Sequence, residues 1–271
     1  MGDYPTSGKL CPESEGIKMV SCRVLRLFAC RSSFAERSRD RYCSLLLFWK
    51  MTFFTKAILF DMDGVLMDST PSVERVWRAW AIAHGLDADR VAGQAHGRRS
   101  IETIRALAPE LDAEKENVVV EQMEIDDKEG VTALPGAAEL LNQLSPDRFA
   151  IVTSATRPLA VARLGYAGIS VPRHIITADD VLHGKPSPEP YLKGAALLGF
   201  AASDCLVFED TPAGIASGRA AGMQAVALQT TYPADQLQAA HAIIGSLANV
   251  KATLRDGNIA IEFVPFPIAR C

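Results

Sequence analysis

Residues 56–69 read KAILFDMDGVLMDS, in which a short apolar run passes directly into an acidic loop. A continuous apolar run is typical of a parallel strand that is buried on both faces of its sheet. The pattern therefore predicts a central strand over 56–60, with the carboxylates of Asp61 and Asp63 at its carboxyl end. Gly64 allows the tight backbone turn that the loop needs directly after them.

Four later segments repeat this pattern of a short buried strand that runs into a polar loop. They are RFAIVTSA at 148–155, RHIITADD at 173–180, DCLVFED at 204–210 and MQAVALQ at 223–229. A helical stretch, AAELLNQL at 137–144, precedes the first of them. Strands that alternate with helices predict an α/β fold with a doubly wound, right-handed parallel sheet. Since ligands of such sheets collect at the carboxyl edges of the strands, we expect the polar loops to converge on one crevice.

The region between the first and second of these strands has a different pattern. Residues 71–131 contain no convincing strand, and their apolar residues recur at helical spacing. Examples of these apolar positions are Val73, Trp77, Trp80 and Ile82. We therefore predict a helical cap domain over 71–131, inserted into a core domain that is formed by 51–70 and 132–271.

The first fifty residues differ from the rest in charge and in cysteine content. They hold nine of the 28 Lys and Arg residues, five of the 32 Asp and Glu residues and four of the six cysteines. They have no sustained amphipathic period, and Met51 stands just ahead of the predicted strand. We expect residues 1–50 to be an unstructured extension, or to precede a true translation start at Met51. The five acidic residues argue against the alternative, an organelle transit peptide.

The composition of the whole chain limits the class of protein. Hydrophobic residues make up 48% of the 271 residues and charged residues 22%, as in ordinary globular proteins. No apolar run approaches the roughly 20 residues that span a bilayer. A net charge of −4 does not favour nucleic acid, which usually binds a basic face. Only Cys205 and Cys271 follow residue 50, so there is no disulfide framework, and we expect a cytoplasmic protein.

Asp61 and Asp63, separated by one residue, can divide the work of phosphoryl transfer. One carboxylate can attack phosphorus and form an aspartyl-phosphate, while the other gives a proton to the leaving oxygen and later takes one from water. Taken alone, the same loop could equally be a plain turn or a calcium-type site.

Glu209 and Asp210 end the segment CLVFED, where two carboxylates are costly unless a cation or hydrogen bonds balance them. Together with Asp61 they would form a site of oxygen ligands only, which favours Mg²⁺. Alternatively, the pair caps the helix that is expected to begin after Thr211. The two roles are compatible.

Two further segments offer groups that can bind a phosphate. Lys185 lies in the proline-rich stretch HGKPSPEPYL at 183–192, whose limited flexibility would hold its ammonium group in place for charge neutralisation. Ser154 offers a hydroxyl group, and Ala155 and its neighbours offer backbone N–H groups. We therefore expect Ser154, Ala155 and Lys185 to bind phosphate. The alternative for Ser154, taken singly, is a helix cap.

Four motifs follow one another in the sequence: FDMDGVLMDS at 60–69, VTSAT at 152–156, GKPSPEPY at 184–191 and VFEDTPAGIASGRAAG at 207–222. In this order they resemble the haloacid dehalogenase superfamily of hydrolases. The resemblance implies that Asp61 is the nucleophile and Asp63 the acid and base. It also implies that Ser154 and Lys185 bind phosphate.

The same resemblance implies a metal cofactor, Mg²⁺. Its site would be built from Asp61, from Asp210 and from the backbone carbonyl group of Asp63, with Glu209 in a supporting position. The implied activity is that of a magnesium-dependent phosphatase that works through an aspartyl-phosphate.

Within the superfamily, three segments of the cap region resemble bacterial phosphatases of hexitol, hexose or glycerol phosphates. They are DSTPSVERVW at 68–77, HGRRSIETI at 96–104 and EGVTALPGA at 129–137. This likeness implies a small phosphorylated sugar or polyol as substrate and a monomer or small homo-oligomer. It also implies that His96, Gly97 and Arg98 meet the substrate from the cap. The alternative for Arg98 and its neighbour Arg99 is a solvated patch of charge.

Other activities fit these residues less well. A mutase that resembles β-phosphoglucomutase typically has a histidine ten residues after the acid/base aspartate, where this chain has Val73. A dehalogenase has no use for Asp63 or for magnesium, because a halide leaves without a proton. A phosphonate hydrolase needs a cap lysine for a Schiff base, and Lys115 and Lys128 stand in no motif. The non-enzymatic alternative is a metabolite-binding protein of the same fold.

Overall fold

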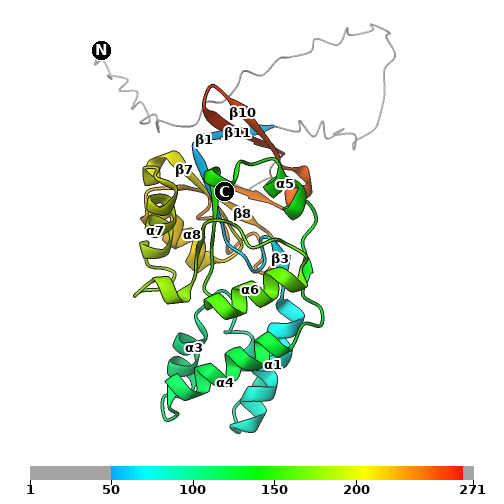
Figure 1. The fold of residues 1–271 in the computed structure, drawn as a ribbon. Helices are drawn as coiled ribbons and strands as arrows, with labels where there is room; N and C mark the ends of the chain where they lie inside the picture. Colours follow the sequence, from blue (N-terminus) through cyan, green and yellow to red (C-terminus); the bar gives the residue numbers. More distant parts are fainter. Residues whose placement is uncertain (1–49, 265–271) are drawn as a thin grey trace, which may run out of the picture.

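The structure, a computed structural model, describes residues 50–264. At its centre is a six-stranded sheet with the strand order β6–β5–β2–β7–β8–β9, in which every neighbouring pair is parallel. Two of its strands, β7 and β8, are labelled in Figure 1. The strands are β2 (Ala57–Phe60), β5 (Phe149–Val152), β6 (Ile175–Ile176), β7 (Cys205–Glu209), β8 (Gln224–Leu228) and β9 (Ala242–Ile244). The predicted α/β fold with a doubly wound parallel sheet is confirmed.

Strand β2 has the central place that its sequence predicts. All four of its residues are buried, and β5 and β7 flank it. From β2 the chain goes first to β5 and β6 on one side, and then to β7, β8 and β9 on the other. The strand order thus reverses next to β2, and in such sheets the crevice at the reversal point binds ligands. The acidic loop 61–69 leaves β2 at this crevice.

Helices cover both faces of the parallel sheet. The helices are α5 (Ala137–Asn142), α6 (Arg157–Tyr166), α7 (Glu189–Leu198) and α8 (Pro212–Ala220). On one face, Tyr191 of α7 and Ile215 of α8 pack into a cluster with Leu59 of β2. On the other face, Leu140 of α5 and Leu159 of α6 join a second cluster. Cover on both sides is required because the strands of a parallel sheet are apolar on both faces.

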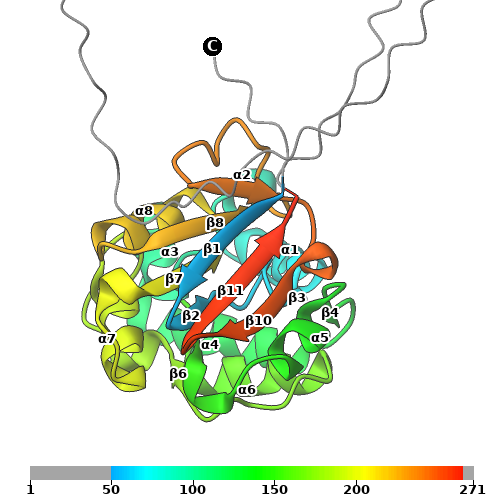
Figure 2. The same ribbon diagram turned by 90° about the horizontal axis from the view of Figure 1, so that it is seen from above.

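A second, antiparallel sheet extends the core at the end opposite to the helices of residues 70–126 (Figures 1 and 2). Its strands, in the order β1–β11–β10, are β1 (Met51–Thr55), β11 (Asn258–Phe263) and β10 (Lys251–Arg255). Phe53 and Phe263 stack at a ring-centroid distance of 5.7 Å and belong to the same apolar cluster as Phe60. No local pattern in the sequence predicts this sheet, because β1 and β11 come from opposite ends of the described residues.

The region that follows the acidic loop is helical. It consists of α1 (Thr70–Ala83), α2 (Ala88–Ala92), α3 (Ser100–Leu107) and α4 (Ala113–Asp126). These helices enclose their own apolar cluster, in which Trp77 and Trp80 meet edge to face at 5.5 Å. Two short strands, β3 (Met67–Asp68) and β4 (Thr132–Ala133), pair where the chain enters and leaves this region. The helical region is therefore joined to the core through two adjacent chain segments.

One apolar residue of the first helix does not join this cluster. Ile82 was expected at the same helical spacing as Trp77 and Trp80, but it is 70% exposed. Because each residue turns an α-helix by about 100°, Ile82 points away from the face that carries the two tryptophans. The helix itself is as predicted, but Ile82 does not belong to its apolar face.

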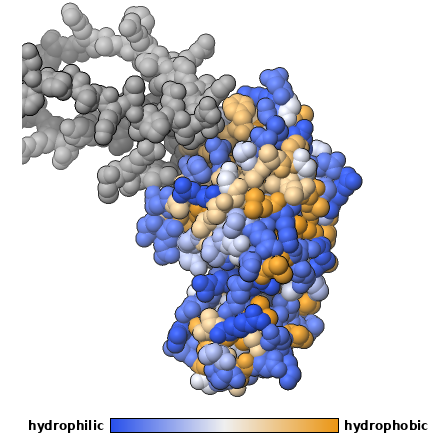
Figure 3. Space-filling model, turned by 90° about the vertical axis from the view of Figure 1, so that its left-hand side faces the viewer, coloured by the Kyte–Doolittle hydropathy of each residue, from blue (hydrophilic) through white to orange (hydrophobic). Residues whose placement is uncertain are grey.

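Figure 3 shows hydrophilic and apolar residues interspersed on one face of the molecule, over both the core and the helical region. Within residues 50–264, no helix is both long enough and apolar enough to cross a bilayer. The predictions for residues 1–49, and for the end of the core domain at 265–271, lie outside the described residues.

Candidate active site

Parallel pairing brings the two acidic segments of the sequence together. The register aligns Phe60 of β2 with Phe208 of β7, and the backbone N–H of Asp61 donates a hydrogen bond to the carbonyl oxygen of Phe208 at 2.9 Å. The residues that follow, Asp61 after one strand and Glu209 and Asp210 at the end of the other, therefore leave the sheet side by side. This is the convergence that the sequence predicted.

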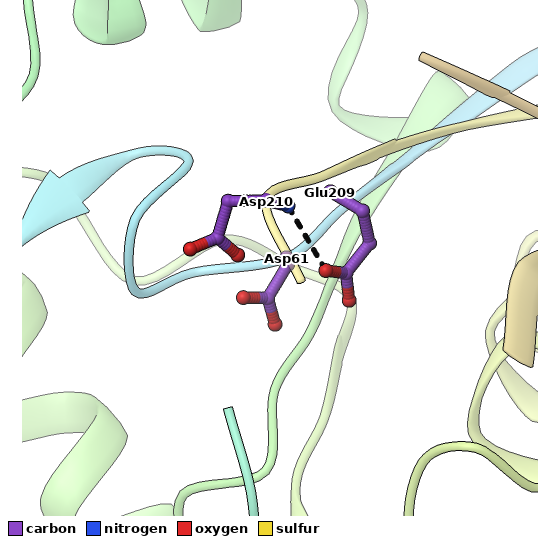
Figure 4. A group of neighbouring side chains, drawn as sticks. All are labelled: Asp61, Glu209 and Asp210. Atoms are coloured by element: carbon purple, nitrogen blue, oxygen red, sulfur yellow. Dashed lines mark hydrogen bonds between the residues drawn. The ribbon is translucent and has the colours of Figure 1, made fainter. Parts of the chain in front are cut away.

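Asp61, Glu209 and Asp210 form a buried group of three carboxylates (Figure 4). One oxygen atom from each residue lies within 4.8 Å of the others, and the residues are 5%, 0% and 2% exposed. Like charges so close together in the interior are unfavourable without a counter-charge. Within the part of the chain that the structure describes, this is the one group of at least three His, Cys, Asp or Glu residues with the spacing of a metal site.

Lys185 supplies one counter-charge from the loop that precedes α7. Its ammonium group donates hydrogen bonds to Asp61 Oδ1 at 2.5 Å, to Glu209 Oε1 at 2.6 Å and to the carbonyl oxygen of Val152 at 3.1 Å. Burial alone would lower the pKa of Lys185, but the two carboxylates raise it above its ordinary value. Lys185 is therefore charged, and all three of its N–H donors are in use.

One lysine does not balance three carboxylates. Burial raises the pKa of Asp61 to about 7, although Lys185 acts in the opposite direction. Burial also raises the pKa of Asp210 well above its ordinary value, and the neighbouring carboxylates of Glu209 and Asp61 add to this effect. A divalent cation at this point would favour the charged form of both aspartates.

The hydrogen bonds distinguish Glu209 from Asp210. Glu209 Oε1 accepts from Lys185 and, at 2.8 Å, from the hydroxyl group of Tyr191. Glu209 Oε2 accepts from the backbone N–H of Asp210 and from both the N–H and the hydroxyl group of Thr211. Asp210 Oδ1, in contrast, is buried without a hydrogen-bond partner. An orphaned carboxylate oxygen in this group fits a hard cation that prefers oxygen ligands.

Asp63 is held by two donors from different parts of the chain. Its Oδ1 accepts hydrogen bonds from the hydroxyl group of Ser69 at 2.6 Å and from Arg163 Nη1 at 3.1 Å. Arg163 belongs to α6 and is buried, and its Nη2 lies 3.2 Å from Glu124 Oε1 of α4. Arg163 and Glu124 are not among the site residues predicted from the sequence. The available signal was a charged residue one turn after Leu159, on the face of α6 that packs inward.

A cavity lies between the core and the helical region. Seven of the predicted site residues line it: Asp61, Asp63, His96, Gly97, Arg98, Ser154 and Ala155. Lys185, Glu209 and Asp210 lie outside this lining. The predicted residues thus form two sets, one that lines the cavity and one that is buried. Asp61 belongs to both.

The helical region reaches the core at Gly97. The hydroxyl group of Ser154 donates a hydrogen bond to the carbonyl oxygen of Gly97 at 3.3 Å. Arg99 makes a second bridge, from its Nη1 to the carbonyl oxygen of Leu182 at 3.1 Å, and is therefore not simply a solvated charge. Burial lowers the pKa of His96, so its imidazole group is neutral at the wall of the cavity near neutral pH.

Comparison with known protein families and curated proteins places these residues in a wider context. A family model of haloacid dehalogenase-like hydrolases matches residues 55–222. Hexitol phosphatase A of Escherichia coli (strain K12) is 41% identical over 213 residues, which cover 76% of this chain and 99% of that protein. Glycerol-1-phosphate phosphohydrolase 2 of Saccharomyces cerevisiae is 40% identical over 195 residues, which cover 67% of this chain and 78% of that protein.

Solved structures include the same architecture. A hydrolase from Pseudomonas syringae superposes with a TM-score of 0.64 at 26% sequence identity, over 71% of this chain and 94% of that one. These similarities agree with the resemblance of the four sequence motifs.

Proposed function

Because this chain belongs to the haloacid dehalogenase-like hydrolase family, we propose that it is a phosphatase that uses Asp61 to release phosphate from small sugar or polyol phosphates. The observation that carries this proposal is the place of Asp61. Its carboxylate lies both in the wall of the cavity and in the buried carboxylate group. One side chain can thus meet a substrate on one side and a cation on the other.

Asp61 acts as the nucleophile. Lys185 bonds to Asp61 Oδ1, which orients the carboxylate and leaves Oδ2 to attack phosphorus. A bond forms between this oxygen and phosphorus while the bond from phosphorus to the alcohol oxygen breaks, and the product is an aspartyl-phosphate. Water then attacks the same phosphorus, the bond to Asp61 breaks, and inorganic phosphate leaves.

Asp63 moves the proton in both steps. Its Oδ1 is held by Ser69 and Arg163, so Oδ2 is the oxygen that can gain and lose a proton. Asp63 gives a proton to the leaving alcohol oxygen and later takes one from the attacking water. Because Ser69 and Arg163 both bond to the same oxygen, the orientation of the carboxylate is kept between the two steps.

The donor set supports Mg²⁺ as the cofactor. Asp61, Asp210 and the backbone carbonyl group of Asp63 would hold it, and Glu209 would support the site by fixing Lys185. When bound, Mg²⁺ supplies positive charge to the phosphate oxygens. Direct coordination of Mg²⁺ by Glu209 stays a prediction, because both oxygens of this carboxylate already accept hydrogen bonds.

Residues at the cavity wall would bind the rest of the substrate. Ser154 and Ala155, which line the cavity, would meet phosphate oxygens, and His96, Gly97 and Arg98 would meet the alcohol part from the helical region. The donors of Lys185 are engaged, so a direct contact with phosphate would require it to exchange one of its hydrogen bonds. The named substrates of the relatives, hexitol and glycerol phosphates, are small and rich in hydroxyl groups, with which polar residues of the cavity wall such as Arg98 can form hydrogen bonds.

A panel of phosphate esters tests the proposal. Hexitol, hexose, deoxyhexose, pentose and glycerol phosphates are incubated with the full chain and Mg²⁺, and inorganic phosphate and isomeric products are both measured. We expect free phosphate from at least one sugar or polyol phosphate. Folded protein that releases none would support a binding protein instead, and isomers without free phosphate would support a mutase. The cytoplasmic location and the small oligomeric state stay predictions.

A further inference from the structure

Arg163 lies between two carboxylates that belong to different parts of the fold. Its Nη1 bonds to Asp63 Oδ1 of the core loop, and its Nη2 lies 3.2 Å from Glu124 Oε1 of α4. All three residues line the cavity. The guanidinium group of Arg163 therefore lies between Glu124 and Asp63, the residue that protonates the leaving alcohol.

Glu124 is almost fully buried, and one of its carboxylate oxygens is held by two neighbouring side chains. The indole Nε1 of Trp77 donates a hydrogen bond to Glu124 Oε1 at 3.2 Å, and Arg163 approaches the same oxygen. Glu124 is 3% exposed. Among residues 50–264, no donor forms a hydrogen bond with its second oxygen, Oε2. A carboxylate oxygen that has no protein donor at a cavity wall can accept a hydrogen bond from a hydroxyl group of a ligand.

Arg163 shows the matching feature on the donor side. Its Nε and Nη2 atoms are buried and lack hydrogen bonds of good geometry within the described residues, although the side chain is only 6% exposed. Buried guanidinium donors are normally satisfied, so the incompletely bonded donors of Arg163, next to the carboxylate of Glu124, indicate a partner that the described residues do not supply. A hydroxyl group is such a partner, because its oxygen accepts and its hydrogen donates.

We infer that Glu124 and Arg163 bind the hydroxyl group on the carbon next to the phosphate ester, and so select vicinal-diol phosphates over simple alcohol phosphates. The inference rests on the proposed function and specifies its substrate class. When the ester oxygen meets Asp63, the hydroxyl oxygen on the adjacent carbon lies about a hydrogen-bond length further along the molecule. Arg163 holds Asp63 with one terminal nitrogen and Glu124 with the other, so Glu124 lies on the far side of Arg163 from Asp63. The hydroxyl oxygen accepts from Arg163, and its hydrogen is donated to Glu124 Oε2.

Two substrates that differ in one hydroxyl group test the inference. Glycerol 1-phosphate has the adjacent hydroxyl group, and the monophosphate of propane-1,3-diol lacks it. For the full-length wild-type protein with Mg²⁺, we expect kcat/KM to favour glycerol 1-phosphate by about tenfold or more, as for other hydrogen bonds to charged groups. If neither ester nor any member of the panel releases phosphate, the proposed function fails. If both esters are hydrolysed equally well, only this inference fails.

Glu124→Gln then separates recognition from positioning. Removing the charge should lower the preference at least about threefold, through loss of kcat/KM for glycerol 1-phosphate, while the deoxy ester changes little. Trp77→Phe, which removes the indole donor that fixes Glu124 together with part of a buried ring, should reduce the preference in the same direction. If Glu124 merely positioned Arg163 and Asp63, both esters would lose activity equally and the ratio would stay unchanged, which overturns the inference.

Glu121→Gln is the matched control on the same helix. Glu121 accepts a hydrogen bond from Thr156 of the core at 2.9 Å, so it also joins the helical region to the core, but it does not line the cavity. The preference for glycerol 1-phosphate should be that of the wild type in this variant. An equal change in Glu121→Gln and Glu124→Gln would show that the contact between α4 and the core matters, not the hydroxyl group.

Discussion

The ammonium group of Lys185 donates a hydrogen bond to Asp61 Oδ1, although the two residues are 124 positions apart in the chain. Both side chains are almost fully buried. Lys185 also reaches Glu209, so it is the one lysine that neutralises part of the carboxylate group in the structure of residues 50–264. The nucleophile is thus positioned by a charge that belongs to a remote loop.

Removing this charge should destabilise the protein. We expect Lys185→Met to lower the free energy of unfolding of the metal-free protein by about 3 kcal/mol or more, because two buried carboxylates lose their counter-charge. Urea unfolding measures the effect. Lys193→Met is the matched control: Lys193 pairs with Glu189 at the surface and should cost no more than about 1 kcal/mol. Equal losses in the two variants would contradict the role given to Lys185.

Stabilisation by Mg²⁺ should increase with pH. The pKa of Asp61 is raised to about 7 in the folded metal-free protein, above its ordinary value, so the folded chain keeps a proton that the unfolded chain releases. The stability due to this proton is complete below the ordinary pKa of an aspartate and is lost as the pH rises through about 7.

A cation that binds the charged carboxylates must displace this proton at low pH. We therefore expect Mg²⁺ to raise Tm more at about pH 8 than at about pH 6, with a weaker apparent Kd at the lower pH. Thermal unfolding with and without Mg²⁺ at each pH measures both. A shift in Tm that is independent of pH would show that the ion binds elsewhere than at Asp61 and Asp210.

The nucleophile itself can be removed with little effect on folding. Asp61→Asn should lower kcat by at least about a thousandfold, because an amide does not attack phosphorus to form the acyl-phosphate. Since burial already raises the pKa of Asp61, a neutral side chain of the same shape should leave the Tm of the metal-free protein nearly unchanged or slightly higher. Phosphate release and thermal unfolding are the two measurements.

Two comparisons make the Asp61 result specific. Asp204→Asn changes a carboxylate that pairs with Lys56 at the surface, and it should retain full activity. Asp63→Asn should slow phosphate release by about a hundredfold or more, as expected for loss of a general acid and base. Near-normal turnover in Asp61→Asn would rule out the proposed nucleophile.

The contact between the helical region and the core should require a residue without a side chain at position 97, which is Gly97. Gly97 has a φ of +72°, and a Cβ atom there would lie 2.6 Å from Thr211 Cγ2. We expect Gly97→Ala to lower kcat/KM about tenfold or more, because the loop no longer seats against the core.

Gly85 provides a control with the same backbone conformation. Its φ is +67°, but a Cβ atom there would meet nothing within 4 Å. Both substitutions should cost about 1 kcal/mol in unfolding free energy from backbone strain, whereas only Gly97→Ala should impair catalysis. Loss of activity in both variants would mean that strain within the helical region is responsible, not the contact with Thr211.

The parallel sheet and the acidic group at its edge could be predicted from the amino-acid sequence. Short strands that are buried on both faces are marked by their own composition, as in AILF of β2. The carboxyl ends of parallel strands meet at one edge of the sheet, so Asp61, Glu209 and Asp210 were expected at the same edge once the strands were identified. These inferences needed only local patterns and the rules of sheet topology.

The partners of the buried charges were decided only by the tertiary structure. No local pattern indicates that Lys185 bonds to Asp61, that both oxygens of Glu209 are already occupied, or that Arg163 lies between Asp63 and Glu124. Such pairs form where segments far apart in the chain, such as α4 and α6, pack against each other. Periodicity reports whether a side chain points inward, but the atom that it meets there depends on the packing of the whole fold.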